Sequence, residues 1–200
     1  MIKHFKLIAV ILYLFFPTKS YSLIEVDITR GNLNPLPVAV SPIFSDKKSN
    51  DELKKKLDIN NLGSEISKVI EMNLKRTGLF NPLEREAFLQ KPDVAHLKPR
   101  FEDWSLIKAQ ALITGKVEFK DDKVRVEFRL WDVLAAREML ALAFTTVPNN
   151  WRRIGHIISD KIYHRLTGEK GYFDTRIIYV SEKGPKTKRI KKLAIMDQDG

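Results

Sequence analysis

The chain contains 200 residues with a mass of 23.1 kDa, which allows one sizeable domain or one domain plus part of another. Its content of 30% charged and 44% apolar residues is ordinary for a globular protein and argues against extensive disorder. The formal net charge of +10 is compatible with anionic partners without identifying one. The lack of cysteine excludes disulfides, thiol catalysis, a lipoprotein anchor and a Cys-ligated zinc site.

The first 22 residues have the organisation of a secretory signal peptide. Lysines precede the unbroken apolar run Leu7–Phe16, and small residues at Ser20 and Ser22 define a cleavage site between Ser22 and Leu23. A membrane span needs about 20 apolar residues, so the shorter run favours cleavage over an uncleaved signal anchor. The leader holds three of the 35 basic residues and none of the 25 acidic ones, so its removal leaves a net charge of +7. We expect a soluble, exported protein without stable membrane insertion, and export argues against nucleic acid as a partner.

A short alternating segment begins the mature chain. After Leu23, the apolar residues Ile24, Val26 and Ile28 alternate with the polar residues Glu25, Asp27 and Thr29, which is the pattern of a half-buried or edge strand. Such a strand can belong to its own domain, or it can add to the edge of a partner's sheet through backbone hydrogen bonds. The pattern alone leaves these two possibilities close to even.

A strand, a loop and a long helix are expected next. The nearly continuous apolar run Leu36–Phe44 predicts an interior strand closed by Pro42, and the highly charged stretch 45–56 predicts a solvated loop. Apolar residues at helical spacing then predict a helix that ends before Gly78, which can take the left-handed conformation beyond its last turn. These apolar residues are Ile66, Val69, Ile70 and Leu74.

A proline-rich stretch and a short helix follow. Three prolines interrupt any long element between residues 81 and 100. Residues 101–108 predict a helix that is capped through Asp103 and anchored by Trp104.

The clearest pattern in the chain predicts an antiparallel meander. Ala111–Phe119 and Lys123–Trp131 read as strands joined by a turn at Asp121 and Asp122, and Glu138–Val147 returns as a third strand. The second strand alternates strictly, so one face should meet the core and the other the solvent. The core face carries Val124, Val126, Phe128 and Leu130, and the solvent face carries Arg125, Glu127 and Arg129.

A second long helix and a hairpin complete the chain. Pro148–Leu166 predicts a helix that Gly168 ends, followed by strands at Thr175–Ser181 and Lys191–Met196 and a polar turn at 197–200. The buried stripe of the helix is Trp151, Ile154, Ile158 and Ile162. An isolated hairpin is not independently stable, so we expect the chain to stop inside a larger structure.

Histidines on the second helix are the nearest approach to a catalytic or metal site. His156, Asp160 and His164 share one helical face, but three positions over two turns span about 12 Å, too far to converge on one ion. We therefore favour a hydrogen bond from His156 to Asp160 at the margin of the core or of a domain. A zinc-dependent hydrolase using these two residues is the weaker alternative. The sequence predicts no catalytic residue, no metal site and no cofactor.

A basic cluster in the hairpin allows a second alternative. The cluster could bind anionic lipid or lipopolysaccharide together with Arg125 and Arg129, or its lysines could simply protect an exposed edge. We favour protection of the edge. The six cations are Lys183, Lys186, Lys188, Arg189, Lys191 and Lys192.

Several segments together resemble the TolB family, the soluble periplasmic components of the bacterial Tol–Pal system. The most specific is Trp151–Ser181, supported by Leu36–Phe44, Arg76–Phe80, Val124–Val133 and the terminal Asp-Gln-Asp-Gly turn. The resemblance implies an α/β domain with a mixed sheet and two long helices, similar in fold to the anticodon-binding domain of class II tRNA synthetases. A six-bladed β-propeller then follows.

The resemblance also implies a division of the chain into parts. Residues 1–22 would be the signal peptide, 23–167 the α/β domain, 168–173 a linker and 174–200 the first strands of the propeller. At about 40 residues per blade, roughly 240 residues of propeller would lie beyond the chain.

The function implied by the resemblance is that of a non-enzymatic adaptor. TolB proteins bind TolA through the mature N-terminus and the lipoprotein Pal through the propeller, which maintains the outer membrane and drives its invagination at division. Some bacteriocins use the system for import. The TolA-binding residues here would be Leu23, Ile24, Glu25, Val26, Asp27, Ile28 and Thr29. Since the Pal-binding blades are missing, we expect no high-affinity Pal binding from residues 1–200, and the resemblance assigns no role to His156 or Asp160.

Overall fold

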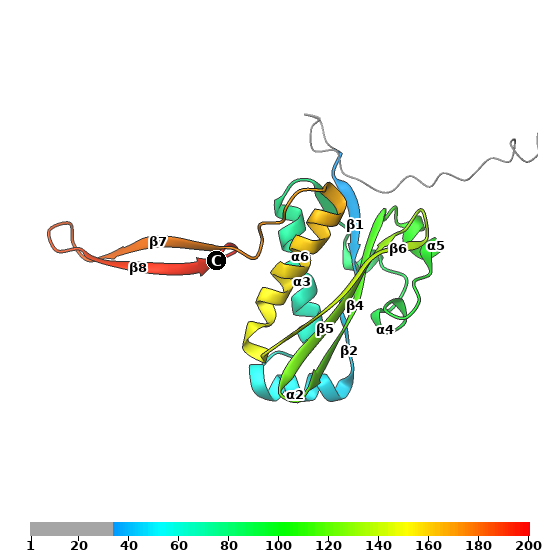
Figure 1. Ribbon diagram of the computed structural model, residues 1–200, viewed down its shortest axis with the longest axis horizontal. Coiled ribbons are helices and arrows are strands. Elements are labelled where there is room, and N and C mark those ends of the chain that lie inside the picture. The colour runs from blue at the N-terminus through cyan, green and yellow to red at the C-terminus, as the bar shows by residue number, and fades with distance from the viewer. Residues whose placement is uncertain (1–33) are drawn as a thin grey trace, which may run out of the picture.

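A mixed sheet forms the centre of the molecule in the computed structural model, which describes residues 34–200 (Figure 1). The strands lie in the order β3-β1-β4-β5-β6, and β2 also pairs with β4. Pairing is parallel among β1, β2, β3 and β4 and antiparallel from β4 to β6. Their bounds are β1 Leu36–Val40, β2 Phe44–Ser45, β3 Phe80–Pro82, β4 Ala111–Lys120, β5 Lys123–Asp132 and β6 Arg137–Thr146. The expected mixed α/β architecture is confirmed.

The predicted meander is confirmed almost residue for residue. Asp121 and Asp122 both have positive φ, 52° and 57°, which gives the tight turn between β4 and β5 the twist that a two-residue hairpin favours. Val124, Val126, Phe128 and Leu130 of β5 are fully buried, while the charged residues that alternate with them lie on the other face, where Arg125 pairs with Glu127. Strict alternation in sequence thus fixed which face of the sheet meets the core.

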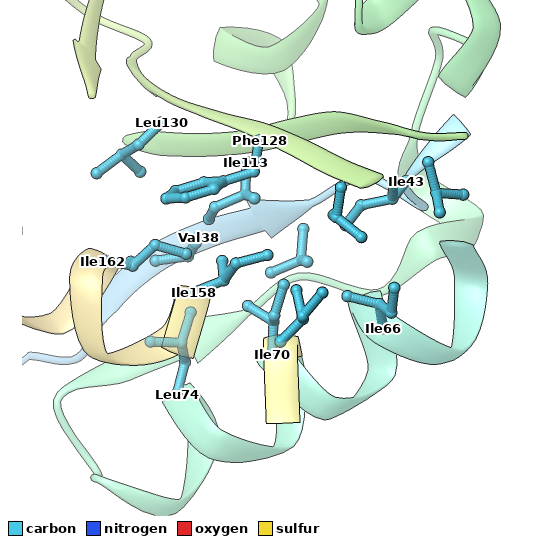
Figure 2. Close-up of a cluster of buried hydrophobic side chains, with 14 of the residues drawn as sticks. Val38, Ile43, Ile66, Ile70, Leu74, Ile113, Phe128, Leu130, Ile158 and Ile162 are labelled. Atoms are coloured by element: carbon cyan, nitrogen blue, oxygen red, sulfur yellow. The ribbon is translucent and has the colours of Figure 1, made fainter. Parts of the chain in front are cut away.

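Two long helices pack on one face of the sheet and enclose the main core. They are α3 (Leu62–Arg76) and α6 (Trp151–Thr167), the latter preceded by the 3₁₀ turn η2 (Pro148–Asn150). Figure 2 shows their isoleucines meeting the sheet residues Val38, Ile113 and Phe128. The helices approach closely at Gly155, where a Cβ would lie 2.8 Å from Val69 Cγ1. Both predicted glycine stops are confirmed, with Gly78 at φ 72° and Gly168 at φ 78°.

The predicted loop at 45–56 is wrong, because this stretch forms helix α2 (Lys47–Leu57). Asp46 caps it by accepting a hydrogen bond of 2.7 Å from the backbone N–H of Ser49. Leu53 is completely buried and anchors the helix to the core. The helix was not predicted because its many lysines leave too few apolar residues to form a recognisable helical stripe. The single strand expected at Leu36–Phe44 is likewise divided into β1 and β2.

A small second core lies under the proline-rich segment. This segment forms the 3₁₀ turn η1 (Arg85–Ala87) and is followed by the short helix α5 (Phe101–Leu106); between them lies the short helix α4 (Pro92–Ala95). Trp104 is 1% exposed and donates to Gln90 Oε1 at 3.0 Å, which confirms its anchoring role. The predicted cap through Asp103 is wrong. The Asp103 carboxylate instead accepts from the Arg100 side chain.

The last two strands form a separate hairpin, β7 (Arg176–Lys183) and β8 (Ile190–Asp197), that projects from the domain (Figure 1). Every residue of β7 is exposed, including Ile178 and Val180, and Leu193 of β8 is 77% exposed. No helix within residues 34–200 is long and apolar enough to cross a membrane.

Candidate functional site

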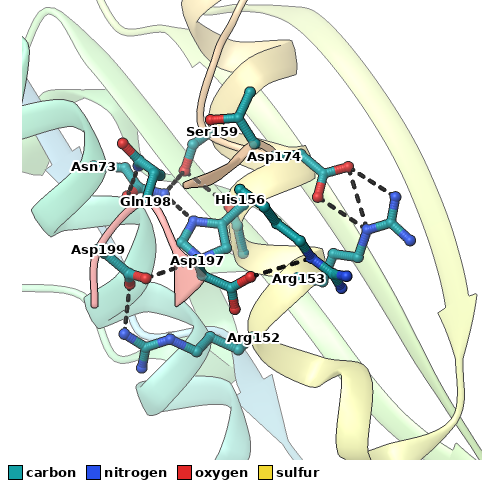
Figure 3. A network of polar contacts seen from close by, with 12 residues as sticks. Asn73, Arg152, Arg153, His156, Ser159, Asp174, Asp197, Gln198 and Asp199 are labelled. Atoms are coloured by element: carbon teal, nitrogen blue, oxygen red, sulfur yellow. Dashed lines mark hydrogen bonds and ion pairs between the residues drawn. The ribbon is translucent and has the colours of Figure 1, made fainter. Parts of the chain in front are cut away.

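The predicted partner-binding residues Leu23–Thr29 and the cleavage site at Ser22 and Leu23 lie outside the described residues. Within residues 34–200, the most developed polar site is the contact between the long helices and the turn that follows β8, and Figure 3 shows its side chains.

The turn at residues 197–200 is held by polar contacts from both helices. Arg152 of α6 donates to Asp199 Oδ2 at 2.5 Å. From α3, Arg76 donates to the backbone carbonyl of Gln198 at 3.3 Å, and Asn73 Oδ1 accepts from Gln198 Nε2 at 3.2 Å. The side chain of Asp199 is only 4% exposed. The hairpin is therefore attached to the domain at both of its chain ends, through the turn after β8 and through the connection after α6, which lie at the same end of the β7–β8 ladder.

His156 lies at the centre of this contact and is buried. Asn73 Nδ2 lies 3.0 Å from His156 Nδ1 and donates to Ser159 Oγ at the same distance, and the Ser159 hydroxyl donates to the carbonyl of Gly155. On the other side of the ring, His156 Nε2 lies 3.5 Å from Asp199 Oδ1. Burial lowers the pKa of His156 below its ordinary value, in spite of the opposing effect of Asp199.

The predicted hydrogen bond between His156 and Asp160 is wrong. Asp160 turns to the chain after α6, where its carboxylate accepts the backbone N–H groups of Phe173 at 2.7 Å and Asp174 at 3.2 Å. His164 contacts the carbonyl of Glu169 through Nδ1. The three side chains share a helical face but have separate partners.

Asp160 fixes the path of the segment that leads from α6 to β7. A Cβ at Gly171 would lie 2.4 Å from Asp160 Oδ1, so only glycine allows the chain to approach the carboxylate this closely. About two turns earlier on α6, Arg153 binds the Asp174 carboxylate through three hydrogen bonds, of 2.9, 3.0 and 3.3 Å (Figure 3). Helix α6 therefore orients both the beginning and the end of the hairpin.

The basic residues named as possible anion ligands are partly neutralised. Arg125 pairs with Glu127, and Arg129 Nε lies 3.6 Å from Glu138 Oε2 on the neighbouring strand. In the hairpin, Arg189 and Lys191 both contact Glu182, and these hydrogen bonds lower the pKa of the Glu182 carboxyl. These ion pairs reduce the positive charge available to an anionic surface.

No group of three or more His, Cys, Asp or Glu side chains converges in the described part of the chain in a way that could hold a metal ion. The polar contact around His156 was not predicted. Buried polar residues at Asn73 and His156, on helices otherwise recognised by their apolar stripes, were the available signal.

The geometry defines an α/β domain whose helices hold the terminal turn of a β-hairpin. Residues 24–139 match the TolB amino-terminal domain family, and the chain belongs to that family. The resemblance drawn from the sequence is thereby confirmed.

Two relatives illustrate the similarity. The Tol-Pal system protein TolB of Pelagibacter ubique (strain HTCC1062) is 75% identical over 190 residues, covering 95% of this chain and 43% of the relative. The chain thus spans less than half the length of that relative. The crystal structure of TolB from Acinetobacter baumannii shares the fold, with a TM-score of 0.67 at 22% identity, over 89% of this chain and 40% of that chain.

Proposed function

We propose that this chain is part of a periplasmic, non-enzymatic adaptor of the Tol–Pal system that maintains the outer membrane and assists its invagination at division. The observation that carries the proposal is the 75% identity to a Tol-Pal system protein over 95% of the chain. Since the chain covers less than half of that relative, the functions of the whole protein are extended to it by inference. Use of the system by bacteriocins for import is part of the same proposal.

TolA is the partner we propose for the mature N-terminus. The alternating residues Leu23–Thr29 suit addition to the edge of a partner's sheet, where backbone hydrogen bonds supply affinity and every second side chain supplies specificity. The signal peptide at 1–22 would deliver this segment to the periplasm with Leu23 as the first residue.

The hairpin is, in our proposal, the start of a six-bladed propeller. Residues 23–167 would form the α/β domain, 168–173 the linker and 174–200 the first propeller strands. Strands β7 and β8 expose apolar side chains, as is typical of strands that pack against further strands in a larger structure. Two strands alone are only marginally stable. Binding to Pal would then require the further blades, so the present chain should bind Pal weakly or not at all.

Removal of the proposed TolA-binding strand tests the proposal. We expect a mature chain lacking residues 23–29 to lose calorimetric binding to the periplasmic part of TolA while its melting temperature and circular dichroism stay unchanged. Unchanged TolA binding by the shortened chain would contradict the assignment.

A matched pair of variants at one position separates strand addition from other contacts. Val26→Pro removes a backbone donor from the middle of the segment and should weaken TolA binding at least tenfold, as loss of about 1.4 kcal/mol or more requires. Val26→Thr keeps a β-branched side chain and the backbone donor, so it should bind within about threefold of the original chain. Equal weakening by both variants would exclude a role for the backbone hydrogen bond.

A further inference from the structure

The hairpin meets the α/β domain at a buried histidine, which makes the attachment sensitive to a proton. The strands themselves are largely exposed, so the hairpin is fixed at its base, where the segment before β7 contacts α6 and the turn at 197–200 contacts both α3 and α6. At the centre of that contact, His156 is 2% exposed and its two ring nitrogens face different groups.

The hydrogen bonds around Asn73 are compatible with only one protonation state of the His156 ring. The Asn73 carbamoyl oxygen is used by Gln198 Nε2, so its NH₂ group must face His156 and Ser159. Ser159 Oγ can accept this N–H because its own hydrogen is directed to the Gly155 carbonyl. His156 Nδ1 is then an acceptor, and the neutral ring carries its hydrogen on Nε2, facing Asp199.

A second proton on His156 would break this arrangement. Protonated Nδ1 becomes a donor that faces the Asn73 NH₂ group at 3.0 Å, so two donors oppose each other. Rotating the Asn73 amide relieves the conflict but places NH₂ against Gln198 Nε2, which is also a donor. The rotation that relieves the conflict at His156 therefore disrupts the hydrogen bond between Asn73 and Gln198, and in this way protonation is transmitted to the turn.

The charged groups around the ring do not remove the conflict. Asp199 favours protonation from the Nε2 side, but Arg152 of the same helix already binds its carboxylate and opposes a second positive charge. Arg76 of α3 adds another cation at Gln198, whereas Asp197 and Asp174 favour the protonated ring more weakly than burial disfavours it.

We propose that His156 is a proton-sensitive latch that holds the turn at 197–200, and with it the β7–β8 hairpin, against α3 and α6 while neutral and releases it when protonated. The latch consists of contacts within residues 34–200 and involves neither TolA nor Pal. Its effect is to make the angle between the domain and the hairpin depend on pH.

The direction of the pH effect follows from linkage. A released, solvated His156 has a pKa of about 6.5, and the buried ring of the latched state has a lower pKa. The released state therefore binds more protons between these two values. Each pH unit of acidification in that interval increases the released-to-latched ratio by up to about tenfold, and no further change is expected below the lower pKa.

Spin-label distances across the contact test the proposal directly. The chain lacks cysteine, so Lys68→Cys on α3 and Lys186→Cys on the hairpin can be labelled as a unique, exposed pair. We expect one narrow distance distribution at pH 8 and a broad one at pH 5. The matched control His164→Gln, an exposed histidine on the same helix, should keep this response, whereas His156→Gln should abolish it.

A charge change at position 73 gives a second, independent test. Asn73→Asp would offer a carboxylate that accepts from both Gln198 Nε2 and protonated His156 Nδ1. In this variant, the distance distribution at pH 6 should therefore be as narrow as at pH 8, or narrower. The histidine NMR signals of the unsubstituted chain should show His156 as the Nε2–H tautomer with a pKa below 6.5. The latch would be contradicted by a distance distribution that does not change with pH. It would equally be contradicted if His164→Gln lost the pH response, or if the distribution of Asn73→Asp still broadened in acid.

Discussion

The α/β domain and the hairpin are ordered by different forces. The sheet and the two long helices share one continuous core in which Phe128, Ile113 and Ile158 are completely buried. Within residues 34–200, the hairpin contributes no residue to a buried core, and its apolar side chains, Ile178 and Leu193 among them, are exposed. The domain has this core in addition to its strand pairing, whereas the hairpin relies on its ladder of backbone hydrogen bonds and on the contacts that α6 makes with its two ends.

The largest contrast should appear when one apolar side chain is shortened in each part. Phe128→Ala leaves a cavity in the main core and should lower the free energy of unfolding by about 3–5 kcal/mol. The matched change Ile178→Ala removes a side chain that is 64% exposed and should alter it by less than about 0.5 kcal/mol. Urea denaturation measures both, and similar losses would show that the hairpin has a core of its own.

An intermediate effect is expected where the two long helices touch. Gly155→Ala would place a Cβ 2.8 Å from Val69 Cγ1 and should destabilise the domain by about 1–3 kcal/mol. The double variant with Val69→Ala should recover part of the loss, because the opposing methyl groups are removed. A double variant no more stable than the sum of the two single changes would exclude steric contact as the cause.

Smaller, local effects should follow from cutting one attachment of the hairpin. Asp160→Ala removes the acceptor for the backbone N–H groups of Phe173 and Asp174 and should speed their hydrogen exchange by about tenfold, as expected from loss of about 1–2 kcal/mol of local stability. Amides of β4 and β5 should keep their protection. Loss of protection in the sheet as well would mean that the domain depends on the hairpin segment.

The smallest effect is expected for a surface ion pair on the sheet. Arg125→Ala should change the free energy of unfolding by at most about 1 kcal/mol, because the pair with Glu127 is half-exposed and screened by water and salt. The difference from the original chain should diminish further in 0.5 M salt during thermal denaturation. A larger loss that persists in salt would indicate packing by the arginine stem instead.

Local patterns in the sequence predicted the elements of the domain but not the partners of its polar residues. The meander followed from strict alternation in β5, and both long helices followed from apolar stripes and terminal glycines. Helix α2 was missed because Leu53 is almost its only buried apolar residue among many lysines.

The partners of the polar residues could not be predicted from residue spacing along a single helix. The interval between His156 and Asp160 correctly placed them on a shared face, yet their partners come from Asn73 on another helix, Asp199 on the terminal turn and Phe173 on the connecting segment. Such long-range choices depend on how the elements pack, which no local pattern records.

The most direct test of the adaptor role is calorimetric titration of the periplasmic part of TolA with the mature chain, at low salt and again at 0.3 M salt. Strand addition predicts saturable one-to-one binding with an affinity that changes little with salt, since backbone hydrogen bonds and apolar contacts carry it. The absence of binding at low salt, or binding that collapses in 0.3 M salt as for an anionic ligand on the basic hairpin, would contradict the proposed function.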